Sequence, residues 1–172
     1  MRHLHTAKHP DIEHLDTATI VQRQATRAIA VRGDKILLLY TARYEDYSLP
    51  GGGVDLGEDL IEGMVRELQE ETGAQNIRDI KPFGVYEEFR PWYKDDADVM
   101  HMHSYCYTCH VDKELGEPNF EEYEIKNGMR AEWVNIHDAI AHNEKTMAHS
   151  EKQGLSIQRE TYLLHLIAKE ML

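Results

Sequence analysis

Apolar residues cluster in runs that predict several β-strands. Five runs rich in branched and aromatic residues have this pattern: ATRAIAV (25–31), KILLLYT (35–41), IRDIKPFGVYEEF (77–89), DVMHMHSYCYTCHV (98–111) and AEWVN (131–135). The tripeptide Arg32-Gly33-Asp34 separates the first two runs. A short glycine-containing break between two such runs predicts a β-hairpin.

Other segments predict helices, with apolar residues at helical spacing in the longer ones. They are residues 58–72, 136–143 and 155–172, and the acidic connection 116–130 adds a helical turn. Strands and helices that alternate in this order predict one α/β domain with a mixed sheet, over residues 19–172. Residues 1–18 are polar and predict an N-terminal arm, either loosely ordered or packed as an extra element on a neighbour.

The segment LPGGGVDLGEDLIEGMVRELQEETGA (49–74) joins a glycine turn to an acidic helix. At about 100° per residue, its apolar stripe consists of Leu60, Ile61, Met64, Val65, Leu68 and Thr72. Glu67, Glu70 and Glu71 lie at i, i+3 and i+4, beside that stripe. Like charges at this spacing repel, and a helix C-terminus disfavours negative charge. The cluster therefore predicts a hard cation such as Mg²⁺, which prefers oxygen ligands.

Neighbouring residues fit the same interpretation. Arg66 precedes Glu70 by four residues and can hold it in place. Gly63 lies one turn before Glu67, and a mid-helix glycine costs about 1 kcal/mol relative to alanine. We therefore expect Gly63 to leave a gap through which a ligand approaches. Gly51-Gly52-Gly53 predicts a turn whose backbone groups face a metal ion or a phosphate.

The segment resembles the box of the Nudix hydrolase family, G-x5-E-x7-R-E-U-x-E-E-x-G-U, in which U is a bulky aliphatic residue. The residues at these spacings are Gly52, Glu58, Arg66, Glu67, Leu68, Glu70, Glu71, Gly73 and Ala74. Ala74 is smaller than the usual final residue and is the one departure. The resemblance extends from about residue 24 to the end. It implies a Nudix-type α/β/α sandwich with a mixed β-sheet.

The resemblance also implies a metal-dependent hydrolase that cleaves the pyrophosphate bond of a nucleoside diphosphate linked to another group. The implied ligands of Mg²⁺ or Mn²⁺ are Glu67, Glu70, Glu71 and the Gly52 carbonyl. Arg66 would orient the glutamates, and Glu58 would support the cluster.

The general base takes a proton from water as the water attacks phosphorus in line. Glu67 is one candidate for this role. In many family members the base comes from a later loop, which here is the acidic run with Glu121, Glu122 and Glu124. The choice stays open, and the catalytic candidates are Glu67, Arg66, Glu58 and Glu122.

Aromatic and basic residues outside the box are candidates for substrate recognition. Aromatic rings can stack on a flat base, and arginines can meet a phosphate or a ribose. The candidates are Arg43, Tyr47, Arg90 and Trp92, with Tyr44 and Tyr93 nearby. Because the chain lacks long basic insertions for a polyphosphate tail, we expect ADP-ribose as the first substrate and a nucleoside triphosphate as the second. The products would be AMP and a sugar phosphate.

Charge and hydropathy exclude several other functions. The net charge is −12, and no cluster of cations indicates nucleic-acid binding or an enzyme of the decapping type. No apolar run reaches the roughly 20 residues that span a bilayer, and no secretory signal is present. We expect a cytoplasmic protein that acts on a nucleotide-derived small molecule, without nucleic-acid or membrane partners, and a homodimer stays open.

Two further functions on the same fold are less well supported. A domain that senses a nucleotide without cleaving it would often lack a box glutamate, and none is missing here. An isomerase of isopentenyl diphosphate would need cysteine and histidine chemistry that does not map onto this chain.

The remaining cysteines and histidines lie in predicted strands or in the arm. Cys106 and Cys109 are three residues apart, so their side chains point to opposite faces of a strand, and we expect reduced cysteines. His101 and His103 share one face. We favour a hydrogen-bonded or substrate-lining role for them over metal binding.

Overall fold

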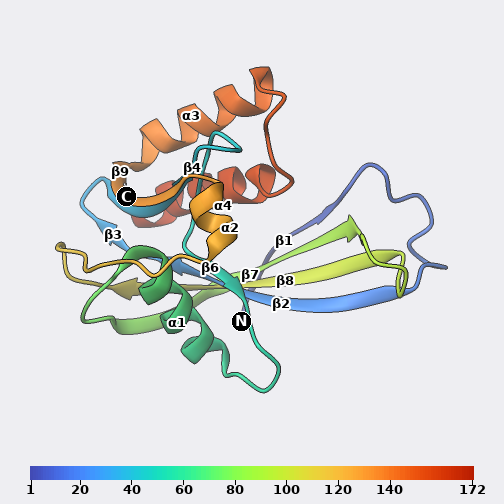
Figure 1. The fold of residues 1–172 in the computed structure, drawn as a ribbon, viewed down its shortest axis with the longest axis horizontal. Helices are drawn as coiled ribbons and strands as arrows, with labels where there is room; N and C mark the ends of the chain where they lie inside the picture. The colour runs from blue at the N-terminus through green and yellow to red at the C-terminus, as the bar shows by residue number, and fades with distance from the viewer.

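The computed structural model describes residues 1–172, and its strands form two sheets (Figure 1). The larger sheet has the strand order β1 (His3–Lys8), β7 (Arg78–Pro91), β8 (Val99–His110), β2 (Ile20–Ile29) and β6 (Gly51–Gly53). β1 is parallel to β7 and β2 is parallel to β8, whereas the β7/β8 and β2/β6 pairs are antiparallel. The predicted mixed sheet is therefore confirmed.

The smaller sheet is antiparallel and is built around β4 (Lys35–Thr41). β9 (Met129–Asn135) pairs with one edge of β4, and β3 (Val31–Arg32) and β5 (Asp46–Ser48) pair with the other. Successive β4 side chains point to opposite faces. Leu38 packs into a core with residues of the two C-terminal helices, while Leu37 packs into a second core with the box helix. Both side chains are fully buried.

Helices cover the two sides of the sheets (Figure 1). α1 (Leu60–Thr72) lies on one side, and α3 (Ile136–His149) and α4 (Ile157–Met171) lie on the other. α2 (Glu122–Lys126) is a short helix in the acidic connection. The α/β/α arrangement agrees with the predicted fold class. None of these helices combines the length and apolar character needed to cross a membrane.

Capping residues set the ends of α1. The Asp59 carboxylate accepts hydrogen bonds from the N–H groups of Ile61 (3.0 Å) and Glu62 (3.2 Å). Gly73 ends the helix in a left-handed conformation, with φ of 67°. The helix therefore begins two residues later than the predicted segment 58–72, because Asp59 is its cap.

Several predicted elements have different bounds in the structure, and three differences are the largest. The hairpin contains only β3 and β4, because the strand predicted over 25–31 breaks at Ala30. β2 starts at Ile20 and pairs with β8, so its polar first half is a strand that the hydrophobic pattern missed. The helix predicted over 136–143 continues to His149. The polar arm contributes β1, which the larger sheet holds at one edge.

The first strand is packed against the end of the chain. The Tyr162 hydroxyl of α4 donates a hydrogen bond to the Leu4 carbonyl (3.2 Å), and Arg2 forms an ion pair with Glu170 (2.5 Å). Gly84 makes room for this strand, since a Cβ there would lie 2.4 Å from Leu4 Cδ2. The first strand and the last helix of the described chain are thus in direct contact.

The two cysteines are buried, unlinked and on opposite faces of β8, as predicted. Cys106 packs in the core with α3 and α4, and Cys109 packs in the core with α1. Burial raises the pKa of the Cys106 thiol to about 12 and that of Cys109 to about 11. Both thiols are therefore protonated and unreactive at neutral pH.

Two glycines with the same backbone conformation test how tightly the box is held. A Cβ on Gly73 would lie 2.1 Å from the Gly116 carbonyl oxygen, whereas Gly33, with φ of +62°, has no atom within 4 Å of its added Cβ. Gly33→Ala should lower the free energy of unfolding by about 1 kcal/mol, the penalty for a left-handed residue. Gly73→Ala should lower it by about 3 kcal/mol, because overpacking adds to that penalty. Urea unfolding of both variants measures the difference, and equal losses would contradict this account.

Candidate active site

The apolar stripe of α1 determines where its carboxylates lie. Met64 and Leu68 are fully buried against the larger sheet and β4, with Ala28 and Leu37 among their neighbours. Glu67 and Glu70 flank this stripe and remain partly exposed. The helix therefore presents its carboxylates along the boundary between the core and the solvent, next to the glycine turn.

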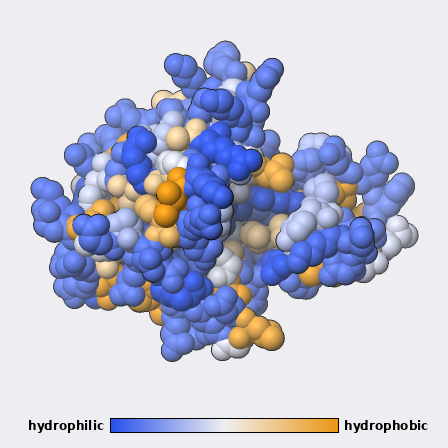
Figure 2. All heavy atoms as spheres, viewed as in Figure 1, coloured by the Kyte–Doolittle hydropathy of each residue, from blue (hydrophilic) through white to orange (hydrophobic).

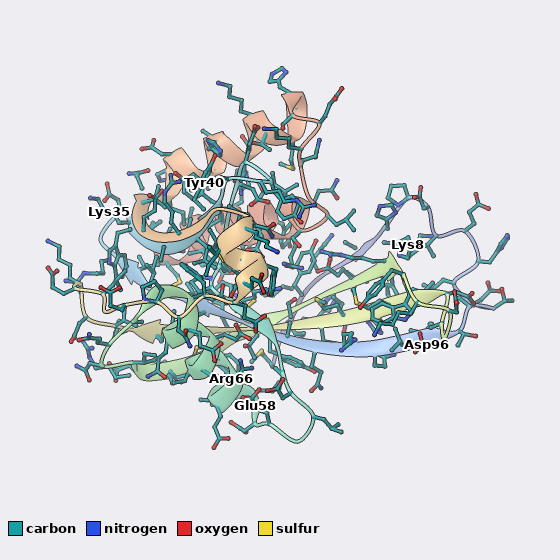
Figure 3. All side chains as sticks on the ribbon, viewed as in Figure 1. Lys8, Lys35, Tyr40, Glu58, Arg66 and Asp96 are labelled. Carbon is teal, nitrogen blue, oxygen red and sulfur yellow. The ribbon has the colours of Figure 1, made fainter.

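Arg66 is the centre of the acidic cluster. Its Nε and Nη2 donate to the two carboxylate oxygens of Glu58, at 2.8 and 3.0 Å. Its Nη1 donates to Glu67 (3.0 Å) and Glu70 (3.4 Å). Figure 3 shows Arg66 and Glu58 side by side below the sheet. The hydrogen bonds from Arg66, followed by one from the Asp55 N–H, lower the pKa of Glu58 to about 2. One guanidinium thus orients three carboxylates, as the resemblance implied.

Glu71 is the buried member of the cluster, with 3% of its surface exposed. Its Oε1 accepts a hydrogen bond from the Gly51 N–H (3.1 Å). Burial, followed by the carboxylates of Glu67 and Glu124, raises the pKa of Glu71 well above its ordinary value. A Cβ on Gly52 would lie 2.9 Å from the Glu67 carboxylate. The glycine turn therefore lies directly against two of the predicted ligands.

The predicted gap at Gly63 is occupied by another residue of the box. A Cβ on Gly63 would lie 3.1 Å from Glu58 Oε1 and 3.5 Å from Val54 Cγ2. Gly63 therefore makes room for the Glu58 carboxylate that holds Arg66, and the expectation that a ligand enters this space is wrong.

The loop that carries the alternative general bases is attached to the box helix. The Asn119 N–H donates to the Glu70 carbonyl (2.6 Å). Glu124 is 7% exposed, and its Oε1 accepts from the Glu121 N–H (2.8 Å). Burial raises the pKa of Glu124, and the carboxylates of Glu67 and Glu70 add to the shift.

Glu122 has a different environment from Glu124. Its side chain is 86% exposed and forms an ion pair with Lys126 (3.3 Å) on the surface of α2. The structure thus brings Glu124 to the cluster and leaves Glu122, the residue chosen from the sequence, at the surface. The alternation of exposed and buried positions along a helix of one turn could not be predicted from the run of glutamates.

Trp92 lies in a pocket next to the box. With Tyr93 it lines an open pocket of about 600 Å³, whose other side is the loop between β6 and α1. The Arg23 guanidinium lies 5.1 Å from the centre of the Trp92 ring, and Leu56 at the tip of the loop is fully exposed. Figure 2 shows hydrophobic atoms at this loop tip. Arg23 is a residue that sequence reasoning missed, because it belongs to the unrecognised half of β2.

The other three substrate candidates lie elsewhere. Arg90 pairs with Glu88 and lines a separate pocket between β7 and the start of α4. Arg43 donates to Asn127 Oδ1 (3.2 Å). The Tyr47 ring packs against Tyr40, with 5.0 Å between ring centroids, and Figure 3 shows Tyr40 far from the Arg66 and Glu58 pair. The structure therefore does not bring the four candidates together.

A second arginine, Arg27, lies near the cluster with 11% of its side chain exposed, and sequence reasoning missed it too. Arg27 on β2 pairs across the sheet with Gly51 of the glycine turn, and its guanidinium lies 3.8 Å from Glu160 of α4. Its positive charge opposes the upward shift of the Glu71 pKa. The signal in the sequence is an arginine among the alternating apolar residues of ATRAIAV.

Comparisons with known proteins identify the class. A model of the NUDIX domain matches residues 21–155, so the chain belongs to the Nudix family, as the box predicted. Human diphosphoinositol polyphosphate phosphohydrolase 3-alpha is 31% identical over 112 residues, which are 63% of this chain and 60% of the relative. The mouse diphosphoinositol polyphosphate phosphohydrolase 2 is 30% identical over 110 residues, 62% of this chain and 53% of the relative. The chain thus spans less than two thirds of the length of these relatives.

Solved structures share the fold at lower identity. A NUDIX hydrolase from Nitrosomonas europaea superimposes with a TM-score of 0.58 and 16% identity, covering 87% of this chain and 91% of that one. A MutT NUDIX hydrolase from Burkholderia pseudomallei has a TM-score of 0.52 and 20% identity, covering 82% and 96%. These likenesses confirm the fold.

Glu71→Gln should separate catalysis from stability. We expect turnover to fall at least about a hundredfold, because a preorganised electrostatic group commonly contributes that much. The amide keeps an oxygen that accepts from Gly51, and Glu62→Gln, on an exposed part of α1, is the matched control.

The same variant should change the pH dependence of the metal-free protein. The pKa of Glu71 is raised in the fold, so the carboxylate is neutral at low pH and destabilises the fold once pH exceeds its unfolded value of 4.5. In chelator, Glu71→Gln and wild type should unfold alike near about pH 4, and the variant should be the more stable at about pH 7. A variant much less stable than wild type at neutral pH would assign the cluster a structural role.

Gly63→Ala tests the close approach of Glu58. Alanine raises helix propensity by about 1 kcal/mol. Because the new methyl group would press on Glu58 Oε1, we expect a smaller gain in stability than that, together with weaker Mg²⁺ binding. Thermal unfolding and Mg²⁺ titration measure the two effects. If the free energy of unfolding rose by the full value of about 1 kcal/mol and the Mg²⁺ affinity did not change, Glu58 would move freely.

Proposed function

We propose that this chain is a metal-dependent pyrophosphohydrolase. The observation that carries the proposal is the set of box carboxylates: Arg66 bonds three of them, Glu58, Glu67 and Glu70, and Glu71 is buried beside them. A Mg²⁺ or Mn²⁺ ion would be held by Glu67, Glu70, Glu71 and the Gly52 carbonyl. Glu71 is buried with only a backbone N–H as its hydrogen-bond donor, so its carboxylate calls for a further positive charge.

The side chains have separable roles in this proposal. A bound divalent ion would neutralise the phosphate oxygens and lower the pKa of water. Arg66, held by Glu58, orients Glu67 and Glu70, and the Gly51 N–H orients Glu71. The general base is a carboxylate within reach of the attacking water. Glu67 belongs to the carboxylate cluster, and the charge of the cluster raises the pKa of Glu124. Glu122 lies at the surface, so it is the weaker candidate for the general base.

The substrate that fits the pocket is a nucleoside diphosphate linked to a modest group, with ADP-ribose first. Trp92 and Tyr93 offer aromatic rings for a base, at 4.5 Å between their centroids, and Arg23 and Lys94 lie over the Trp92 ring. The pocket opens on the box loop through Asp55 and Glu58. The products would be AMP and a sugar phosphate.

Two other substrate classes compete with this assignment. A nucleoside triphosphate offers the same base and phosphates. Diphosphoinositol polyphosphates are the second competing class, because the relatives described above are named as diphosphoinositol polyphosphate phosphohydrolases. A densely phosphorylated inositol requires several cations, whereas the only basic residue among those lining the pocket is Arg23, opposite Asp55 and Glu58. The charge of the pocket therefore favours the nucleotide.

Three further assignments complete the proposal. The chain acts in the cytoplasm on a small molecule, without nucleic-acid or membrane partners. The hydrolase domain is residues 19–172, and the arm of residues 1–18 adds β1 to the edge of its larger sheet. A homodimer is compatible with the proposal.

A substrate panel tests the proposed specificity. We expect ADP-ribose to have the highest kcat/KM in Mg²⁺, compared with common nucleoside triphosphates and a diphosphoinositol polyphosphate. An advantage of about tenfold, or about 1.4 kcal/mol, for either competitor would overturn the ranking. Binding of ADP-ribose by calorimetry without any product would instead indicate a nucleotide sensor.

Trp92→Ala and Tyr47→Phe distinguish the aromatic candidates. Loss of base stacking at Trp92 should raise KM for ADP-ribose about tenfold or more, with little change in kcat, because stacking contributes about 1–3 kcal/mol per base. Tyr47→Phe keeps the packing on Tyr40 and should leave KM unchanged. An unchanged KM in Trp92→Ala would exclude stacking of the base on Trp92.

A further inference from the structure

A second group of metal-ligating side chains lies on the larger sheet, outside the box. Glu87 on β7 pairs across the antiparallel ladder with His103 on β8. His101 lies on the same strand, two residues before His103. Residues two apart on a strand share a face, so all three side chains point the same way. Their ligand atoms all lie within 4.8 Å of one another. Glu87 is absent from the sequence prediction for these histidines, because it comes from a neighbouring strand.

The separations match a coordination sphere better than a hydrogen-bonded cluster. His103 Nε2 lies 3.4 Å from Glu87 Oε1, and His101 Nε2 lies 3.6 Å from Glu87 Oε2. Both distances exceed the range of roughly 2.7–3.2 Å that is usual for an N–H···O hydrogen bond. Ligands of a tetrahedral ion with bonds of about 2.0–2.1 Å are themselves roughly 3.3 Å apart. The two distances end on different Glu87 oxygens, so an ion between the two histidine nitrogens would face both carboxylate oxygens and need only small side-chain adjustments.

One of these nitrogens is buried without a partner. His101 Nε2 is shielded from solvent and makes no hydrogen bond. Its ring is fixed by stacking on Phe89, with centroids 4.1 Å apart and planes 15° apart. An unpaired buried polar atom is unfavourable, and a metal ion is one partner that removes the penalty.

The surroundings favour a metal with nitrogen ligands. Two of the three side chains are imidazoles, which are common nitrogen ligands of Zn²⁺. The only ion pairs of Glu87 are with the two histidines, so no lysine or arginine competes for its charge. Thr6 of β1 contacts Glu87 Oε2 through its hydroxyl at 3.5 Å and helps to orient it.

The group is separate from the box. Tyr105 packs against the core that contains α1. His103 lies two residues before Tyr105 on β8, so it shares that face of the larger sheet. Strands β2, β7 and β8 extend past the helices in Figure 1. The side chains of Glu87, His101 and His103 are 26%, 16% and 23% exposed, so one side of the group is open to solvent.

We propose that Glu87, His101 and His103 bind one divalent transition-metal ion of the Zn²⁺ class, with a fourth coordination position open to solvent. Two imidazoles and one carboxylate suit Zn²⁺, whereas the all-oxygen box suits Mg²⁺. The ion would join β7 to β8 where no helix covers the sheet. The proposal replaces the hydrogen-bonded or substrate-lining role expected for the two histidines, and it does not depend on the proposed enzymatic activity.

Metal titration of the full chain tests the proposal. Protein stripped with chelator is titrated with Zn²⁺ in excess Mg²⁺, which saturates the box, and Co²⁺ replaces Zn²⁺ for visible absorption. Wild type should bind one equivalent of Zn²⁺ and give the intense absorption of a four-coordinate Co²⁺ site. His103→Gln and the near-isosteric Glu87→Gln should each weaken binding at least about a hundredfold, because losing even an outer-shell partner costs about 10–100-fold.

Two control variants locate the ion. His110→Gln removes an exposed histidine of the same strand, which pairs with Asp79 (2.9 Å), and should leave Zn²⁺ binding unchanged. Glu71→Gln alters the box and should also leave it unchanged. Loss of Zn²⁺ binding in Glu71→Gln, equal affinity in wild type and the folded Glu87→Gln variant, or no Zn²⁺ bound by wild type would each overturn the proposal. Circular dichroism of the metal-free variants confirms that each is folded.

Discussion

The crowding of carboxylates around one guanidinium is the constraint on which the rest of the site depends. Arg66 makes four hydrogen bonds to Glu58, Glu67 and Glu70, whereas a lysine ammonium has only three N–H donors. Glu71 and Glu124 add two further, more deeply buried carboxyl groups. Like charges this close are held together only because the core stripe of α1 and the glycine turn position the backbone first.

That constraint explains why the box could be read from the sequence. The carboxylates occupy i, i+3 and i+4 positions, so local helical geometry alone places them together beside Met64 and Leu68. The apolar stripe predicted the bounds of α1 to within two residues, and the difference at its start arises because Asp59 is the cap and not part of the helix. The position of Glu124 was not predictable in the same way, because it depends on how a distant loop docks on the end of α1.

Local sequence patterns could not predict which distant strands pair with one another. The first half of β2 reads IVQRQ, and it is a strand because β8 pairs with it, not because its residues alternate. β7 shows the same limit within two adjacent residues. Glu87 faces the histidine pair, while Glu88 faces α4 and forms an ion pair with Arg159 (2.6 Å). Which of the two glutamates belongs to which face follows from the register with β8, and that register is set by tertiary contacts.

The attachment of β1 has a consequence for how the chain is made. Leu4 of this strand accepts a hydrogen bond from Tyr162, a residue 158 positions later. Its neighbour β7 also follows only after β2 through α1. During synthesis on a ribosome, β1 must therefore wait, unpaired, until β7 has emerged, and it contacts Tyr162 only after α4 has emerged; contacts between such distant residues form slowly. Its sequence, HLHTAK, is suited to this delay, because a strand rich in polar side chains is a poor template for pairing with other nascent chains.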